Sequence, residues 1–179
     1  MKKTIIICGL ADIQHCVDKY NPDKMLTIIN QNFSPETPKG MNETRHIKML
    51  IDDISEPREG FILPQKHHAQ ALLDFTDDWD TSKPLLVHCH MGISRSTSTS
   101  LGVAAKFDPD NIESIIENLK EIAPHASPNK IMTQYYDEIM KVQYASLILS
   151  IHKAEKEDRR VRVGWTGYID RDVKNIINK

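Results

Sequence analysis

Short blocks of apolar residues recur along the chain. Some are continuous runs, as in buried strands, and others repeat every three or four residues, as in helices. Apolar runs predict buried strands at residues 3–9, 24–30, 46–51 and 83–88. Apolar residues at helical spacing predict helices at residues 11–20, 64–79, 96–106, 111–122 and 128–140, the last of which could continue to residue 149. Strands that alternate with helices favour an α/β fold.

We expect one domain, because 179 residues suit a single compact unit with a substantial core. This domain is predicted to cover residues 1–150 as a three-layer α/β fold, with a central mixed sheet of about four or five strands flanked by helices. Beyond His152, basic residues outnumber acidic ones and apolar anchors become sparse. Residues 151–179 are therefore predicted to form a charged C-terminal extension.

Two stretches rich in proline, glycine and polar residues interrupt the regular pattern. Residues 31–44 are predicted to form a surface loop. Residues 52–63 follow the third predicted strand directly, so this second loop should lie at the carboxyl end of the sheet. Open α/β sheets bind their ligands at that end, which makes the second loop a candidate part of a functional site.

The fourth predicted strand leads directly into the most informative stretch of the sequence. It ends in His88 and Cys89, five residues follow (His90, Met91, Gly92, Ile93 and Ser94), and Arg95 and Ser96 open a helix. A loop over a helix N-terminus directs backbone N–H groups inward and adds the positive end of the helix dipole. Gly92 permits the tight turn that such a loop needs. The stretch therefore predicts a cradle for a phosphate group.

The side chains around this cradle favour covalent phosphoryl transfer. Arg95 can direct its planar fork at two phosphoryl oxygens. Cysteines at helix N-termini have a pKa of roughly 3.5 to 7.5, so we expect Cys89 to be a thiolate nucleophile at neutral pH. His88 is predicted to orient Cys89 by hydrogen bonding, and the Ser96 hydroxyl to stabilise the departing sulfur, with Ser94 as a weaker candidate for that role.

This stretch resembles the signature of the cysteine-dependent protein tyrosine and dual-specificity phosphatases, His-Cys-x-x-Gly-x-x-Arg-Ser/Thr, at every fixed position. The resemblance, to a compact bacterial-type member, implies a phosphotyrosine-phosphatase-like fold and a phosphocysteine intermediate. It also implies a general acid on an upstream loop, for which Asp53 matches best and Asp52 is the alternative. Asn129 resembles an asparagine that supports the phosphate loop in compact members.

The function that follows from this resemblance is hydrolysis of phosphotyrosine in proteins or peptides, with phosphoserine and phosphothreonine as further candidates. The backbone of residues 90–95 would bind the phosphate. Two other classes stay open: a phosphatase acting on RNA 5′ ends, inositol lipids or small phosphorylated metabolites, and a non-catalytic phosphate-binding module. The phosphate loop contains no lysine, which makes strongly anionic inositol lipids a weaker candidate.

Composition narrows these alternatives. A formal net charge of −2 and a pI near 6.4 argue against bulk binding of nucleic acid. No apolar run near the start is long enough for a membrane span or a signal peptide, so a cytoplasmic location is expected. The three cysteines (Cys8, Cys16 and Cys89) have no Cys-x-x-Cys spacing, which argues against a disulfide framework and a zinc site. We therefore expect catalysis without a metal or other cofactor.

Four acidic residues gather around the end of the second predicted helix: Asp74, Asp77, Asp78 and Asp80. A metal site is conceivable there, but such runs are more often solvated turn residues, and we interpret them so. The oligomeric state cannot be inferred from the sequence.

Overall fold

The computed structural model describes residues 3–141. The strands are β1 (Ile5–Cys8), β2 (Lys24–Ile29), β3 (His46–Leu50) and β4 (Leu85–His88), and the α-helices are α1 (Ile13–Tyr20), α2 (Lys66–Asp74), α3 (Arg95–Phe107), α4 (Ile112–Ile122) and α5 (Lys130–Met140). Every predicted strand and helix of this range is present in the predicted order. The possible continuation of α5 to residue 149 and the predicted extension 151–179 lie outside the described residues.

The four strands form one sheet in the order β1-β4-β2-β3, and every pairing between neighbours is parallel. The α/β class and the number of strands agree with the prediction, but the expected mixed sheet is wrong for the described residues. Each of the first three strands is followed by a long connection that returns the chain to the same end of the sheet: α1 after β1, the 31–45 segment after β2 and α2 after β3. Antiparallel neighbours are joined by short turns, and no such hairpin connects these four strands.

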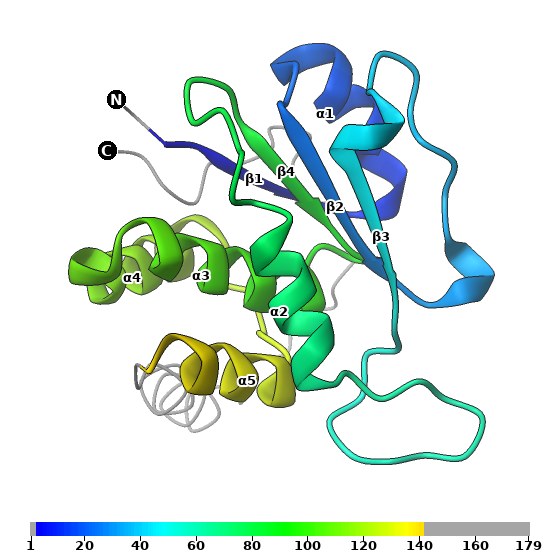
Figure 1. The fold of residues 1–179 in the computed structure, drawn as a ribbon, viewed down its shortest axis with the longest axis vertical. Helices are drawn as coiled ribbons and strands as arrows, with labels where there is room; N and C mark the ends of the chain where they lie inside the picture. The colour runs from blue at the N-terminus through cyan, green and yellow to red at the C-terminus, as the bar shows by residue number, and fades with distance from the viewer. Residues whose placement is uncertain (1–2, 142–179) are drawn as a thin grey trace.

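Helices cover both faces of the sheet, which confirms the three layers: α1 lies on one side and α2 to α5 on the other (Figure 1). Alternate strand residues supply the two cores. Leu26 and Val87 belong to the large core beneath α2 to α5, whereas Met25 and Leu86 belong to the smaller core beneath α1. The central strands β2 and β4 are therefore buried on both faces, as is usual in parallel sheets.

The helix α3 runs through the centre of the larger core. All its residues from Arg95 to Ala105 are buried. The absence of a side chain at Gly102 allows close packing, because an added Cβ atom there would lie 2.6 Å from the ring of Tyr136 on α5. The Tyr136 hydroxyl donates a hydrogen bond to Thr99 Oγ1 at 3.0 Å. This packing compensates for the poor helix propensity of the serines and threonines in α3.

The helix α2 is shorter at both ends than the predicted range 64–79. At its start the Gln65 N–H donates to His68 Nδ1 at 3.0 Å, a side-chain cap that places the first helical residue after Pro64. At its end the backbone N–H and the hydroxyl of Thr76 both donate to the Leu73 carbonyl, at 2.9 and 2.6 Å. Side chains that bond the local backbone in this way compete with helical hydrogen bonds.

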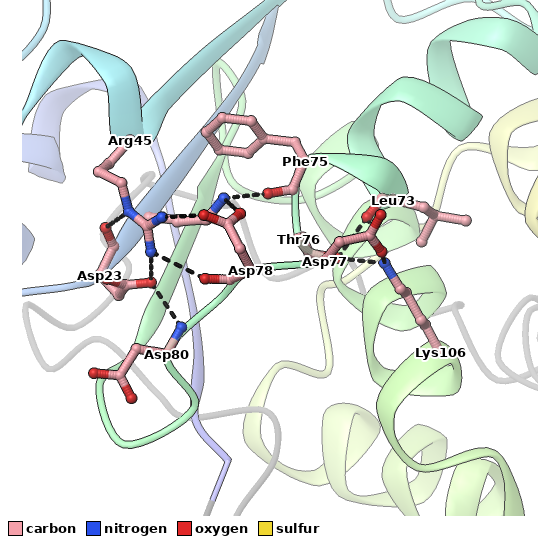
Figure 2. A network of polar contacts seen from close by, with 10 residues as sticks. Asp23, Arg45, Leu73, Phe75, Thr76, Asp77, Asp78, Asp80 and Lys106 are labelled. Carbon is pink, nitrogen blue, oxygen red and sulfur yellow. Dashed lines mark hydrogen bonds and ion pairs between the residues drawn. The ribbon is translucent and has the colours of Figure 1, made fainter.

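Two of the acidic residues after α2, Asp77 and Asp78, form ion pairs, and those of Asp78 lie at the amino ends of β2 and β3 (Figure 2). Arg45 donates to Asp78 at 2.6 Å and also pairs with Asp23, while the buried Lys24 pairs with Asp78. The hydrogen bond from Lys24 is the main cause that lowers the pKa of Asp78. Lys106 of α3 pairs with Asp77. All four acidic residues (Asp74, Asp77, Asp78 and Asp80) are exposed, as predicted, but Asp77 and Asp78 are ion-paired rather than merely solvated.

Candidate active site

The central strand β4 positions the candidate site. It lies between β1 and β2 and ends at His88, and α3 begins seven residues later at Arg95. Residues 89–94 therefore form a loop over the N-terminus of α3, at the carboxyl edge of the sheet. We call this segment the phosphate loop, after its predicted ligand. This is the strand-loop-helix arrangement that the sequence predicted. A ligand in this loop would lie at the carboxyl end of the sheet, where open α/β proteins bind their ligands.

Gly92 shapes this loop through its backbone. Its φ angle is +70°, in the left-handed region that glycine adopts without strain. An added Cβ atom would lie 2.7 Å from the carbonyl carbon of Cys8 and 2.9 Å from the nitrogen of Gly9. A hydrogen bond of 3.0 Å from Leu10 N–H to the His90 carbonyl further attaches the loop to the segment after β1. Any side chain at position 92 would therefore push the loop away from β1.

Cys89 is buried beneath this loop, with its sulfur 3.2 Å from the Ser96 hydroxyl. Burial raises the pKa of the Cys89 thiol, but the side chain and backbone of Ser96, the charge of Arg95 and the backbone of Ile93 lower it more. The net result is a pKa below the ordinary cysteine value. This is the direction predicted from the sequence, and it favours the thiolate.

Arg95 is nearly fully buried and is held by the end of β3. One terminal nitrogen donates to the Ile51 carbonyl at 2.7 Å. Its Nε is buried and has no hydrogen-bond partner among the described residues, and it lies 3.9 Å from an oxygen of Asp53. An anchored guanidinium with an unsatisfied N–H suits the recognition of an additional anion.

The structure separates the two candidate acids. Asp53 contacts the phosphate loop: one carboxylate oxygen accepts hydrogen bonds from Ser94 Oγ at 2.6 Å and from Asn129 Nδ2 at 2.9 Å. Asp52 instead accepts from the Ile62 N–H at 2.7 Å, while its own N–H donates to the Ile62 carbonyl at 2.9 Å. Asp52 thus closes the neck of its loop, and Asp53 is the carboxylate that faces the candidate site.

Asn129 joins three segments, as the resemblance implied for a supporting residue. Its side-chain oxygen caps α5 by accepting from Met132 N–H at 3.2 Å, and its amide nitrogen donates to Asp53. Its backbone N–H donates to the Ser94 carbonyl at 3.3 Å. The start of α5, the acidic loop and the phosphate loop are therefore held together by one buried residue.

His88 contacts the backbone of Cys89 and the side chain of Thr27, and Thr27 in turn contacts His46; Thr27 and His46 were not predicted from the sequence. Its Nδ1 lies 3.3 Å from the Cys89 carbonyl, and its Nε2 lies 2.6 Å from Thr27 Oγ1. The same threonine oxygen lies 2.6 Å from Nε2 of His46. Burial lowers the pKa of His88 to about 4, and burial together with Lys48 lowers that of His46 to about 4. The sequence offered little signal for either residue: Thr27 is a polar residue among the apolar residues of β2, and His46 is the first residue of β3, which also contains Lys48.

The other side chains of the loop differ in exposure. His90 and Met91 are exposed, and the His90 ring packs at 4.7 Å, centroid to centroid, on the exposed ring of Phe33. Ile93 and Ser94 are half-buried, and the Ile93 carbonyl accepts from Ser127 N–H at 3.0 Å. The predicted phosphate contacts of residues 90–95 would thus come from the backbone and Arg95, while the side chains of His90 and Met91 are exposed.

Solved structures of phosphatases have the same architecture. A human tyrosine phosphatase-like serine/threonine/tyrosine-interacting protein matches with a TM-score of 0.58 and 15% identity, over 81% of this chain and 93% of the other. Human DUSP28 matches with a TM-score of 0.57 and 11% identity, over 86% and 94%. PTPMT1 in complex with PI(5)P matches with 0.56 and 16%, over 82% and 93%. The fold is that of the dual-specificity phosphatases.

Identities of this size establish the architecture rather than the substrate. No protein-family model matches the sequence, and no curated protein matches it either. Within residues 3–141 there is no cluster of three or more histidine, cysteine, aspartate or glutamate residues arranged to hold a metal ion. None of the helices in that range has the length and apolar character needed to cross a membrane.

Proposed function

We propose that this chain is a cysteine-dependent phosphatase that hydrolyses phosphotyrosine in proteins or peptides through a phosphocysteine intermediate. One observation carries the proposal. The sulfur of Cys89, with its lowered pKa, lies 3.2 Å from the Ser96 hydroxyl at the N-terminus of α3, beside the buried and incompletely bonded Arg95. This combination supplies a charged nucleophile and a binding site for a phosphoryl group in one place.

In the first step the Cys89 thiolate attacks phosphorus, a sulfur–phosphorus bond forms, and the ester oxygen departs. Asp53 donates a proton to that oxygen, which gives a free hydroxyl and a phosphocysteine. Arg95 and the N–H groups of residues 90–95 hold the phosphoryl oxygens throughout. Asp53 enters as the acid because it is the carboxylate hydrogen-bonded to the phosphate loop.

In the second step water attacks the phosphocysteine while Asp53 takes a proton from it. The sulfur–phosphorus bond breaks, inorganic phosphate forms, and Cys89 leaves as a thiolate. The Ser96 hydroxyl donates a hydrogen bond to that sulfur, which stabilises its negative charge. Each proton and electron pair is accounted for by Cys89, Asp53 and water, so the cycle needs no cofactor.

A phosphopeptide is the favoured substrate for two reasons. Tyrosine has a pKa near 10, so a phenolate is a better leaving group than an alkoxide. Exposed apolar side chains border the site, among them Met91 and, on the segment after β2, Phe33.

The three free cysteines, which are all buried, support a reducing and therefore cytoplasmic setting.

The decisive experiment measures hydrolysis of an aryl phosphate with and without a chelator. We expect Cys89→Ser to reduce kcat by about 10³-fold or more, because the hydroxyl is a far weaker nucleophile at neutral pH. Cys16→Ser is the matched control, since Cys16 is equally buried but lies in α1. Wild-type activity in Cys89→Ser would reject the mechanism, and phosphate binding without turnover in the wild type would identify a binding module.

The substrate class is tested with a panel of phosphotyrosine and phosphoserine peptides, a 5′-phosphorylated RNA and inositol phospholipids. The lipid belongs in the panel because the similar PTPMT1 structure contains PI(5)P. We expect the highest kcat/KM for phosphotyrosine peptides. A higher kcat/KM for a lipid or an RNA would keep the phosphocysteine chemistry and overturn the assignment of substrate.

A further inference from the structure

A chain of four buried or half-buried side chains leads from the segment after β2 to the backbone of Cys89. Thr37 Oγ1 lies 2.9 Å from Nδ1 of His46, and Thr27 Oγ1 lies 2.6 Å from Nε2 of both His46 and His88. Nδ1 of His88 then lies 3.3 Å from the Cys89 carbonyl. The sheet order explains the juxtaposition, because Thr27 on β2 is directly paired with His88 on β4.

The last contact, between His88 and the Cys89 carbonyl, fixes the direction of every hydrogen bond in this series. A carbonyl only accepts, so His88 Nδ1 carries the proton and, in a neutral ring, His88 Nε2 accepts. Thr27 has one hydroxyl proton and gives it to His88, so Nε2 of His46 must donate to Thr27. His46 Nδ1 is then an acceptor and receives the Thr37 hydroxyl proton. The two histidines therefore have opposite tautomers.

The surroundings favour neutral rings at physiological pH. Thr27 and His88 are fully buried and His46 is nearly so. The charged groups that act on the two rings are Lys48, on the strand of His46, and Arg95, at the start of α3, and both disfavour a further positive charge. Because each neutral ring carries only one N–H, only one assignment of donors and acceptors satisfies all the hydrogen bonds.

We propose that Thr27 and His46 are positioning residues that hold His88 as the Nδ1–H tautomer, so that His88 donates to the Cys89 carbonyl. The N–H dipole offsets the partial negative charge of that carbonyl close to the sulfur. It also secures the end of β4, from which the phosphate loop begins. The proposal rests on the proposed function only in taking Cys89 as the nucleophile.

The tautomers are tested by ¹⁵N NMR of histidine-labelled protein at neutral pH, with the signals assigned by His46→Gln and His88→Gln. We expect the proton on Nδ1 in His88 and on Nε2 in His46. The same tautomer in both rings, or the reverse pair, would overturn the proposal. This measurement does not depend on catalysis, so it stands even if the chain proves not to be a phosphatase.

The effect on the nucleophile is tested with two substitutions at Thr27. Thr27→Val keeps the shape but removes the hydroxyl, whereas Thr27→Ser keeps the hydroxyl and removes a methyl group. We expect Thr27→Val to raise the pKa of Cys89 by about half a unit to one unit and to lower kcat/KM about three- to tenfold below that pKa. Thr27→Ser should stay within about twofold of the wild type.

The pKa is measured as the pH dependence of Cys89 alkylation by iodoacetamide, with the modified peptide identified by mass spectrometry. Thr76→Val is the matched control, because Thr76 is another fully buried threonine that lies after α2, away from the phosphate loop. If packing alone mattered, Thr27→Ser would be the more damaging change, since valine fills the site better. That order, or an equal shift in Thr76→Val, would contradict the positioning role.

Discussion

Two clusters of charge lie at opposite ends of the same sheet, and each centres on an arginine near carboxylates. At the amino ends of β2 and β3, Arg45 donates to Asp78 and pairs with Asp23 (Figure 2). At the carboxyl ends, Arg95 lies 3.9 Å from Asp53. The residue types are the same at both ends, but the surroundings of the two arginines are not.

The difference lies in burial and in unmet hydrogen bonds. The side chains of Arg45 and Asp78 are 24% and 70% exposed, and their charges meet partners on several sides. The side chain of Arg95 is only 6% exposed, and its buried Nε has no hydrogen-bond partner in the described part of the chain. Exposed, fully paired clusters contribute modestly to stability, whereas a buried group with unused donors is typical of a site that binds something else.

The largest expected effect comes from making the same substitution in both arginines, which tests directly whether the two ends of the sheet differ in function. Arg95→Lys should reduce kcat/KM for an aryl phosphate by about 10²- to 10³-fold, because an ammonium cannot bind two phosphoryl oxygens as the planar fork does. Arg45→Lys should leave kcat/KM within about twofold. Equal losses in steady-state assays of both variants would mean that the two ends of the sheet do not differ in function.

The neighbouring aspartates Asp52 and Asp53 allow a second comparison, between two carboxylates at the same end of the sheet. Asp53→Asn should lower kcat about 10²-fold, since the amide cannot protonate the leaving oxygen, while KM changes little. Asp52→Asn should have a much smaller effect on kcat, because Asp52 contacts the Ile62 backbone rather than the phosphate loop. A larger kcat loss in Asp52→Asn would move the general acid to that residue.

The smallest expected effect is on stability and arises from His88, which the site keeps neutral. Its pKa is about 4 in the folded chain and 6.5 in the unfolded chain, so the unfolded state binds more protons between these values. The stability that depends on neutral His88 is fully present above pH 6.5 and is lost as the pH falls from 6.5 towards 4. We expect this loss to be about 2 kcal/mol.

Urea unfolding at pH 7.5 and pH 4.5 measures this loss, and His88→Asn is the reference because it removes the titrating ring. The fall in the free energy of unfolding between the two pH values should be smaller in His88→Asn than in the wild type. Carboxylates that titrate near pH 4 contribute equally to both proteins and cancel in the difference. The same fall in both proteins would show that His88 is protonated alike in the folded and unfolded chains.

Much of the fold could be predicted because the relevant patterns are local. Each strand and helix of the described range was predicted, and so was the loop between Cys89 and Arg95. The errors have specific physical causes. The mixed sheet was wrong because strand direction depends on how the connections cross the sheet, and the end of α2 was wrong because the Thr76 hydroxyl competes for the Leu73 carbonyl.

The candidate site was predicted in part for the same reason. Cys89 and Ser96 contact each other as one continuous motif, and such contacts follow from the spacing of residues. The choice between Asp52 and Asp53 stayed open in the sequence, because both occupy the same loop and only one is turned towards Ser94 and Asn129. Thr27 and His46 were missed entirely, since neither belongs to a motif and their contact across β2 and β3 is visible only in the assembled sheet.

By itself, the sequence determined where strands and helices form and which short motif can hold a phosphate next to a thiol. These properties depend on residues within a few positions of one another. Only the tertiary structure shows the order of the strands, the carboxylate that faces the loop and the contacts among His46, Thr27 and His88 behind Cys89. Those depend on contacts such as Thr27 with His88 and Asp53 with Asn129, which are 61 and 76 positions apart and meet only when the strands assemble.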